Sequence, residues 1–141
     1  MTVNSKSFFK ALRTICDDVI TDTARLRVYE TDGLTAKRQL PAIVVIPSRV
    51  DQVQAIVRLC HQHEVPLVVR GAGTGLSGGA MPHEEGVLLV MAKFNQIISV
   101  DQTAMTACVQ PGVTNLSISE AVADFGLYYA PDPSSQIACT I

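Results

Sequence analysis

The sequence predicts a single domain of mixed helices and strands, and three observations lead to that fold class. The length of 141 residues suits about one domain, and 48% of the residues are apolar, which is enough for a buried core. Short apolar runs of strand length recur along the chain, at 41–47, 65–69 and 86–92. Around them, apolar residues recur at helical spacing, at 5–20, 50–60 and 114–125.

Residues 5–20 are predicted to form the first helix. Apolar residues recur there every three or four positions from Phe8 to Val19, which places them in one stripe. The polar segment 29–40 carries a central Asp-Gly pair and is predicted to be a loop. The chain is therefore expected to begin with a helix and a long connection before its first central strand.

A strand, a helix and a second strand are predicted next. The run "PAIVVIP" (41–47) is β-branched and bounded by prolines, which is typical of a short buried strand. Ser48 is predicted to cap the helix that follows, with Asp51 as the third residue of a capping box. The run "VPLVV" (65–69) gives the second strand, and two strands joined through a helix are expected to be parallel. The buried face of the helix is predicted to comprise Val50, Val53, Val57 and Cys60.

Three more strands are predicted after residue 80. The run "GVLLVMA" (86–92) has the length and composition of a buried strand. Segments 95–101 and 104–112 flank the turn "DQTA" and are predicted to pair as a hairpin. The sheet content of the chain is therefore expected to be mixed, with both parallel and antiparallel pairs.

The third helix is predicted over residues 114–125. Thr114 is a suitable N-cap, and Gly126 suits the left-handed residue that ends many helices. The segment "PDPSS" (131–135) is typical of a rigid turn, because proline fixes φ and Asp and Ser side chains bond to nearby backbone.

Charge and composition exclude several classes of function. The net charge is −2 with no block of like charge, so the sequence gives no electrostatic footprint for nucleic acid and no basic patch for a membrane surface. The longest apolar runs have strand length, far below the roughly 20 residues of a membrane-spanning helix. The N-terminus lacks the apolar core of a signal peptide. We therefore expect a cytoplasmic protein.

No metal site is predicted. The cysteines are widely spaced and are expected to be reduced, mostly buried thiols. His61 and His63 lie two positions apart, which places them on different faces of a helix and disfavours shared metal ligation. The four cysteines are Cys16, Cys60, Cys108 and Cys139.

The stretch "RGAGTGLSGG" (70–79) is the strongest functional signal, because five of its ten residues are glycine. Gly73, Gly75 and Gly78 match the letters of the dinucleotide-binding fingerprint, but Pro82 follows closely, so no helix begins there to face a pyrophosphate. The lysine of a P-loop is also absent. We therefore reject a nicotinamide-type Rossmann site, and an NTP-hydrolysing site is disfavoured.

The bare backbone of this loop favours a bound phosphate group. Consecutive amides in such a loop form a concave anion site, and glycines let a phosphate approach without a Cβ clash. The hydroxyls of Thr74 and Ser77 add two donors. The alternative is a tight turn that binds nothing, although a turn needs fewer glycines. Two roles stay open for Arg70, which are pairing with a phosphate and bonding to carbonyls to brace the loop.

Four segments, in order and in register, resemble a known flavoprotein family. Together they are similar to the N-terminal FAD-binding half of the PCMH-type flavoproteins, the vanillyl-alcohol-oxidase family. Within that family they resemble the group of the glycolate oxidase D subunit and the D-lactate dehydrogenases. The resemblance covers roughly residues 28–141. The segments are "LPAIVVIPSRVDQVQAIVRLC" (40–60), "VPLVVRGAGTGLSGGAMP" (65–82), "QPGV" (110–113) and "APDPSSQIACTI" (130–141).

The resemblance implies an α+β fold, the N-terminal part of the FAD-binding PCMH-type fold, with a strand–helix–strand unit and a mixed sheet flanked by helices. Residues 1–35 would form a helical lead-in, and residues 36–141 an incomplete FAD-binding domain without the substrate domain. The implied cofactor is FAD. The family's cofactor contacts carry over to Arg70, Gly71, Ala72, Gly73, Thr74, Gly75, Ser77, Gly78, Pro111, Gly112, Val113, Pro131, Asp132, Ser134, Ser135 and Thr140.

One of these assignments and one neighbouring residue keep an alternative, and no catalytic residue is assigned. Asp132 lies between prolines, where bracing of the turn competes with a cofactor contact. Cys139 lies near the implied flavin site, but a small buried residue explains it as well as a covalent flavin link does.

The resemblance also implies an activity, which is hydride transfer from the α-carbon of a D-2-hydroxy acid such as glycolate or D-lactate to flavin N5. The chain ends in the apolar run "IACTI" (137–141), so we expect a fragment that is inactive alone. Uncovered sheet edges predict oligomers or swapped assemblies. The implied partners are other subunits of an oxidase complex, which would place the protein at the periphery of the inner membrane without a span of its own. The alternative function is a non-enzymatic small α/β module that binds a phosphate-containing ligand or a protein partner.

Overall fold

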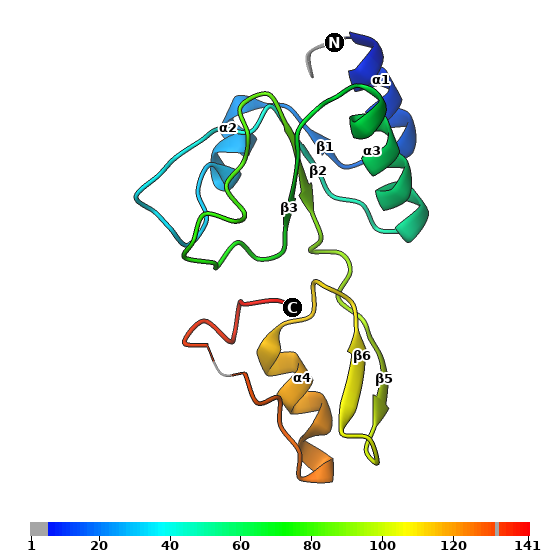
Figure 1. Cartoon of the computed structure of the whole chain (residues 1–141), viewed down its shortest axis with the longest axis vertical. Coiled ribbons are helices and arrows are strands. Elements are labelled where there is room, and N and C mark those ends of the chain that lie inside the picture. Colours follow the sequence, from blue (N-terminus) through cyan, green and yellow to red (C-terminus); the bar gives the residue numbers. More distant parts are fainter. Residues whose placement is uncertain (1–5, 132) are drawn as a thin grey trace.

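The computed structural model describes residues 6–131 and 133–141, and it confirms a mixed α+β architecture (Figure 1). One part of the molecule contains a four-stranded sheet with helices on its faces. The other part contains a two-stranded sheet and one helix, and the C-terminal end of the chain lies between the two parts (Figure 1). Within the described residues, no helix has the length and apolarity that crossing a membrane requires.

The larger sheet has the strand order β1-β2-β4-β3. Strand β4 pairs in parallel with both β2 and β3, whereas β1 pairs antiparallel with β2. The predicted parallel direction of β2 and β3 is therefore confirmed, but β4 is inserted between them. The strands are β1 (Val19–Ile20), β2 (Ile43–Val45), β3 (Leu67–Arg70) and β4 (Val87–Val90).

Both faces of this sheet are buried, which explains the continuous apolar runs of β2 and β4. On one face, Ile43 and Leu89 pack against Phe8 of α1 (Lys6–Ile15) and Ile56 of α3 (Val50–Gln62). On the other face, the alternate residues of the same strands pack under α2 (Thr23–Leu26) and the short 3₁₀ helix η1 (Arg27–Tyr29). The second cluster comprises Ile20, Leu26, Val44, Leu88 and Val90.

The first predicted helix is too long. Helix α1 ends at Ile15, and Val19 belongs to β1, where it lies opposite Val45 of β2. Val19 and its neighbour can pair with the buried strand β2 only if the helix ends before them. Tertiary pairing therefore overrides the helical periodicity at the end of the stripe.

Helix α3 begins one residue later than predicted, and its buried face is rotated. Arg49 rather than Ser48 is the N-cap. Gln52 is 7% exposed and points inward, while Val50 and Val57 are 60% and 43% exposed. The observed buried residues are Gln52, Ile56, Leu59 and Cys60.

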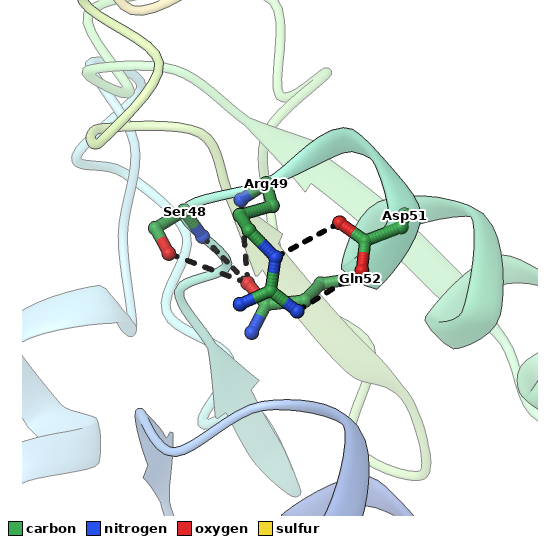
Figure 2. A network of polar contacts seen from close by, with 4 residues as sticks. All are labelled: Ser48, Arg49, Asp51 and Gln52. Carbon is green, nitrogen blue, oxygen red and sulfur yellow. Dashed lines mark hydrogen bonds and ion pairs between the residues drawn. The ribbon is translucent and has the colours of Figure 1, made fainter.

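The inward position of Gln52 has a local cause (Figure 2). Its Oε1 accepts hydrogen bonds from the backbone N–H of Ser48 at 2.9 Å and of Arg49 at 3.3 Å. These donors precede the first turn, where no intrahelical acceptor exists. Asp51 instead pairs with the exposed guanidinium of Arg49. The capping-box residue is thus Gln52, one position after the predicted Asp51.

The second part of the molecule follows the prediction closely. Strands β5 (Ile97–Asp101) and β6 (Thr106–Val109) pair antiparallel as a hairpin. Helix α4 (Asn115–Val122) begins at Thr114, whose side chain accepts a hydrogen bond from the backbone N–H of Ser117 at 3.2 Å. A 3₁₀ turn, η2 (Ala123–Phe125), extends it to Gly126, which has φ +69°. Ile118 and Val122 form its buried stripe, while Phe125 is 47% exposed.

The predicted division of the chain at residue 36 stays a prediction. Helix α1 packs on α3, and β1 pairs with β2, so the lead-in contributes to the same core as the residues that follow.

Candidate cofactor site

The glycine loop begins where β3 ends, at Arg70, and contains no helix or strand up to residue 80. Gly73 has φ +74° and Gly78 has φ +76°, both in the left-handed region that side chains disfavour. The predicted absence of a helix after this loop is confirmed. Two of the five glycines are therefore required by the path of the backbone itself.

The amide groups at the centre of the loop are open. Across residues 6–131 and 133–141, the backbone N–H groups of residues 73–77 have no hydrogen-bond acceptor in the protein. Groups of this kind are normally paired with protein, with water or with a ligand. A run of such donors next to one another is the arrangement that binds an anion.

The loop and the C-terminal segment line one cavity of about 560 Å³. The C-terminal end of the chain lies opposite the loop that follows β3 (Figure 1). Eight of the predicted cofactor contacts meet in this cavity, which are Gly71, Ala72, Gly73, Thr74, Gly75, Ser134, Ser135 and Thr140.

Thr140 holds the two walls of this cavity together. Its Oγ1 accepts a hydrogen bond from the backbone N–H of Ala72 at 3.2 Å. A Cβ on Gly71 would overlap that same oxygen, so only glycine allows the approach. The segment around Thr140 is also fixed to the start of α4, because Thr140 forms a β-bridge with Thr114 and the N–H of Ile141 donates to the carbonyl of Val113 at 3.2 Å.

Pro111, Gly112 and Val113 lie at the junction of the two parts of the molecule and do not line the cavity. The N–H of Gly112 donates to the carbonyl of Phe94 at 2.7 Å. A Cβ on Gly112 would lie 2.6 Å from the carbonyl oxygen of Met91, so this glycine permits close packing of backbone on backbone. Val113 is 2% exposed and belongs to the interior. A direct cofactor contact by these three residues stays a prediction.

Arg70 makes the bracing contact. Its side chain is 9% exposed, and its Nη1 donates to the carbonyl of Thr31 at 2.6 Å. Burial lowers the pKa of the Arg70 guanidinium, and the nearby Asp32 and Tyr29 oppose that shift. The side chain is not part of the cavity wall. Of the two roles left open by the sequence, the structure shows the brace, and pairing with a phosphate stays a prediction.

The remaining predicted contacts lie elsewhere. Ser77 and Gly78 line a neighbouring hollow together with Lys37 and Arg38. Pro131 is exposed and outside the cavity wall. Asp132 lies outside the described residues, so neither of its two predicted roles is tested.

Sequence reasoning missed part of the cavity wall, which includes Leu76, Ala80, Pro133 and Ile141. Cys139 also lies in it, and its Sγ contacts the carbonyl of Thr140 at 3.7 Å. The sequence did hold a signal for two of these residues, because Leu76 lies within the glycine loop and Ala80 directly follows it. Apolar residues beside hydroxyls suit a ligand with both polar and ring portions.

The chemistry of this wall fits a diphosphate. Open amides, glycines and hydroxyls are donors or leave space, and no Asp or Glu side chain occurs among the described residues that line the cavity. Gly75 has open space where a Cβ would lie, so a ligand can approach its backbone directly. Within residues 6–131 and 133–141, no cluster of His, Cys, Asp and Glu could hold a metal ion.

Comparisons with known proteins show the family to which the chain belongs. Residues 41–141 match the family described as FAD binding domain. The chain is 61% identical over 113 residues to glycolate oxidase subunit GlcD of Escherichia coli K12, covering 80% of this chain and 23% of that protein. It is 37% identical over 113 residues to D-lactate dehydrogenase of Archaeoglobus fulgidus, covering 79% of this chain and 25% of that protein.

The fold is shared with a larger protein of known structure. A solved structure of alkyldihydroxyacetonephosphate synthase superposes with a TM-score of 0.82 at 21% identity, covering 97% of this chain and 28% of that one. The chain thus spans about a quarter of the length of the curated relatives described above. These comparisons do not favour the alternative of a non-enzymatic module.

Proposed function

Because the chain belongs to the family of FAD binding domains, its cofactor is FAD, and we propose that the cavity between the glycine loop and residues 133–141 holds the diphosphate of that cofactor. The observation that carries this proposal is the run of unpaired amides at residues 73–76, which lie in the wall of that cavity. Thr74, Ser134 and Ser135 add hydroxyl donors around the same space.

We further propose that the protein serves in the oxidation of a 2-hydroxy acid of the glycolate or D-lactate type. The names of the relatives support this substrate class, and the 61% identity to the glycolate oxidase subunit favours glycolate. Bound FAD supplies the acceptor of the hydride. The residues of this chain bind and orient the cofactor through the loop and exclude water from its diphosphate. We assign no described residue to binding of the hydroxy acid. The chain spans only about a quarter of the length of these relatives.

The same proposal includes partner subunits that receive the electrons. These subunits would lie at the cytoplasmic side of the inner membrane. The support for this proposal is that the related Escherichia coli protein is named as a subunit.

The first experiment tests cofactor binding. The chain is titrated with FAD while flavin fluorescence and the melting temperature are followed. We expect saturable fluorescence quenching and a rise in melting temperature, because a ligand that binds only the folded state stabilises it. Riboflavin, which lacks phosphate, is the control and is expected to bind far more weakly. Equal binding of riboflavin and FAD would contradict the assignment of the cavity to the diphosphate.

The second experiment tests the substrate class. The 113-residue region of the Escherichia coli subunit that matches this chain is replaced by the corresponding residues of the chain. We expect the chimera to bind FAD and to oxidise glycolate, with D-lactate and L-lactate as comparison substrates. A folded, FAD-loaded chimera that oxidises neither glycolate nor D-lactate would overturn the proposed activity.

A further inference from the structure

A second loop lies against the glycine loop and contributes no residue to the cavity wall. It comprises residues 29–34, which precede the region matched by the FAD binding domain family and include none of the predicted cofactor contacts. A Cβ on Gly33 would lie 2.5 Å from the carbonyl oxygen of Thr74 and 2.7 Å from that of Gly75. The backbones of the two loops are therefore in direct contact, and the contact requires glycine at position 33.

Arg70 lies between the two loops. Its Nη1 donates to the carbonyl of Thr31 at 2.6 Å, and its guanidinium carbon lies 5.9 Å from the centre of the Tyr29 ring. On the other side, a Cβ on Gly73 would overlap the same guanidinium. The absence of a side chain at Gly73 thus leaves the space that the Arg70 side chain occupies.

Asp32 completes this arrangement with a buried charge. It is 4% exposed, and its Oδ1 accepts a hydrogen bond from the backbone N–H of Leu34 at 2.9 Å. Its Oδ2 is buried and has no hydrogen-bond partner in the described part of the chain. The nearby carboxylate opposes part of the lowering that burial imposes on the pKa of the Arg70 guanidinium, although the two side chains do not form a direct ion pair.

We propose that Arg70 and Asp32 are positioning residues that hold the glycine loop in the conformation in which its amides face the cavity. This inference rests on the proposed function, because it assigns the purpose of the loop conformation to the FAD diphosphate. A loop that is already ordered loses less conformational entropy on binding. Arg70 and Asp32 therefore raise the affinity for FAD without contacting it.

The experiment compares Arg70→Gln, Arg70→Lys and Asp32→Asn with the unchanged chain. Arg49→Gln is the matched control, because Arg49 is an arginine near an aspartate too, but it lies at the exposed start of α3. Hydrogen exchange of the loop amides is measured without FAD, and FAD affinity is measured by flavin fluorescence at several salt concentrations.

We expect Arg70→Gln to speed amide exchange across residues 71–77 and to weaken FAD binding by about tenfold. Arg70→Lys should recover part of both effects, since it keeps the charge, and Arg49→Gln should change neither. The salt dependence of FAD binding should be the same in Arg70→Gln as in the unchanged chain, because no charge that contacts the phosphates is lost. Unchanged loop exchange, or a clearly smaller salt dependence, would overturn the inference, the latter by showing that Arg70 pairs with the diphosphate directly.

Gly33→Ala gives a second route if Arg70→Gln does not fold. Its added methyl displaces Thr74 and Gly75 and is expected to weaken FAD binding while Arg70 is intact. Unaltered FAD affinity in Gly33→Ala would overturn the inference. If the unchanged chain does not bind FAD at all, the proposed function fails, whereas the exchange measurement without FAD still decides whether Arg70 and Asp32 hold the loop.

Discussion

Single residues of the glycine loop have different physical reasons to be glycine. Gly73 is needed for its φ of +74° and for the space that Arg70 fills. Gly71 allows the approach of Thr140, whereas Gly75 and Gly79 have nothing within 4 Å of the position of a Cβ. The letters of the sequence indicated a special loop, but they did not distinguish these roles, which depend on Thr140 and Arg70 as neighbours.

These differences predict three distinct outcomes for alanine substitutions. Gly73→Ala is expected to destabilise the fold by about 1–2 kcal/mol or more, because alanine disfavours a left-handed φ and its methyl meets Arg70. Gly75→Ala should leave the free energy of unfolding nearly unchanged but weaken FAD binding, since its methyl enters the cavity. Gly79→Ala should affect neither. Urea unfolding and FAD titration of the three variants check this order, and equal FAD affinity in Gly75→Ala and Gly79→Ala would contradict it.

The Cys60 thiol predicts a pH dependence of stability. Burial raises its pKa from 9.0 to about 11, so the folded state holds this proton more tightly than the unfolded state. The resulting stabilisation is fully present below about pH 9 and is lost as the pH rises toward 11. It amounts to about 2–3 kcal/mol at most. The measurement is urea unfolding of the unchanged chain and of Cys60→Ala between about pH 8 and about pH 11. The difference in the free energy of unfolding between the unchanged chain and Cys60→Ala should shrink as the pH rises. A difference that stays constant would argue against this account.

Helices and strands were predictable where the local signal agreed with the tertiary contacts. The run at 41–47 is a strand, the hairpin around 101–104 forms, and Thr114 caps α4 as predicted. The errors have two causes: Val19 joins a strand through long-range pairing with β2, and the buried face of α3 is rotated because Gln52 turns inward to cap the start of its own helix. Neither of those contacts is visible in the periodicity of the sequence.

The start of α3 gives a prediction at the scale of one element. Gln52→Ala is expected to destabilise the protein by about 1–2 kcal/mol, because it removes the acceptor of the Ser48 and Arg49 amides. Asp51→Asn is the matched control and is expected to have little effect, because its ion pair with Arg49 is exposed. Thermal unfolding of both variants tests this, and a larger effect of Asp51→Asn would restore the predicted capping residue.

At the scale of the whole molecule, the cofactor cavity depends on segments far apart in the sequence. The loop after β3 and the segment 133–141 meet through Ala72 and Thr140. Most of the cavity wall could be predicted from the sequence, because the family resemblance implied that motifs far apart in the chain contact the same cofactor. The loop at 29–34 was interpreted only as a connection, because burial of Asp32 and contact of Gly33 with the glycine loop leave no local pattern.

The contact between Ala72 and Thr140 predicts a difference between two small substitutions. Thr140→Val removes the hydroxyl acceptor and should loosen the C-terminal segment, which limited proteolysis after residue 130 would detect as faster cleavage. Thr140→Ser keeps the hydroxyl and should cleave like the unchanged chain. Equal cleavage of all three proteins would show that the hydroxyl does not hold the two walls together.

Exposed apolar residues predict self-association, as the sequence suggested. Ile98, Met105 and Tyr128 are 62%, 74% and 76% exposed on the part of the molecule that contains β5, β6 and α4. Surface of this kind is usually covered by another chain or segment. Size-exclusion chromatography at several protein concentrations should show association that increases with concentration, and a strict monomer throughout would contradict the prediction.

The most direct test of the account follows the loop amides themselves. Amide resonances of the ¹⁵N-labelled chain are recorded while FAD is added, with riboflavin as the control. We predict that the amides of residues 73–77 shift first and saturate with FAD but not with riboflavin. Saturable FAD binding that leaves these resonances in place and shifts a different set of residues would contradict the claim that the glycine loop holds the diphosphate.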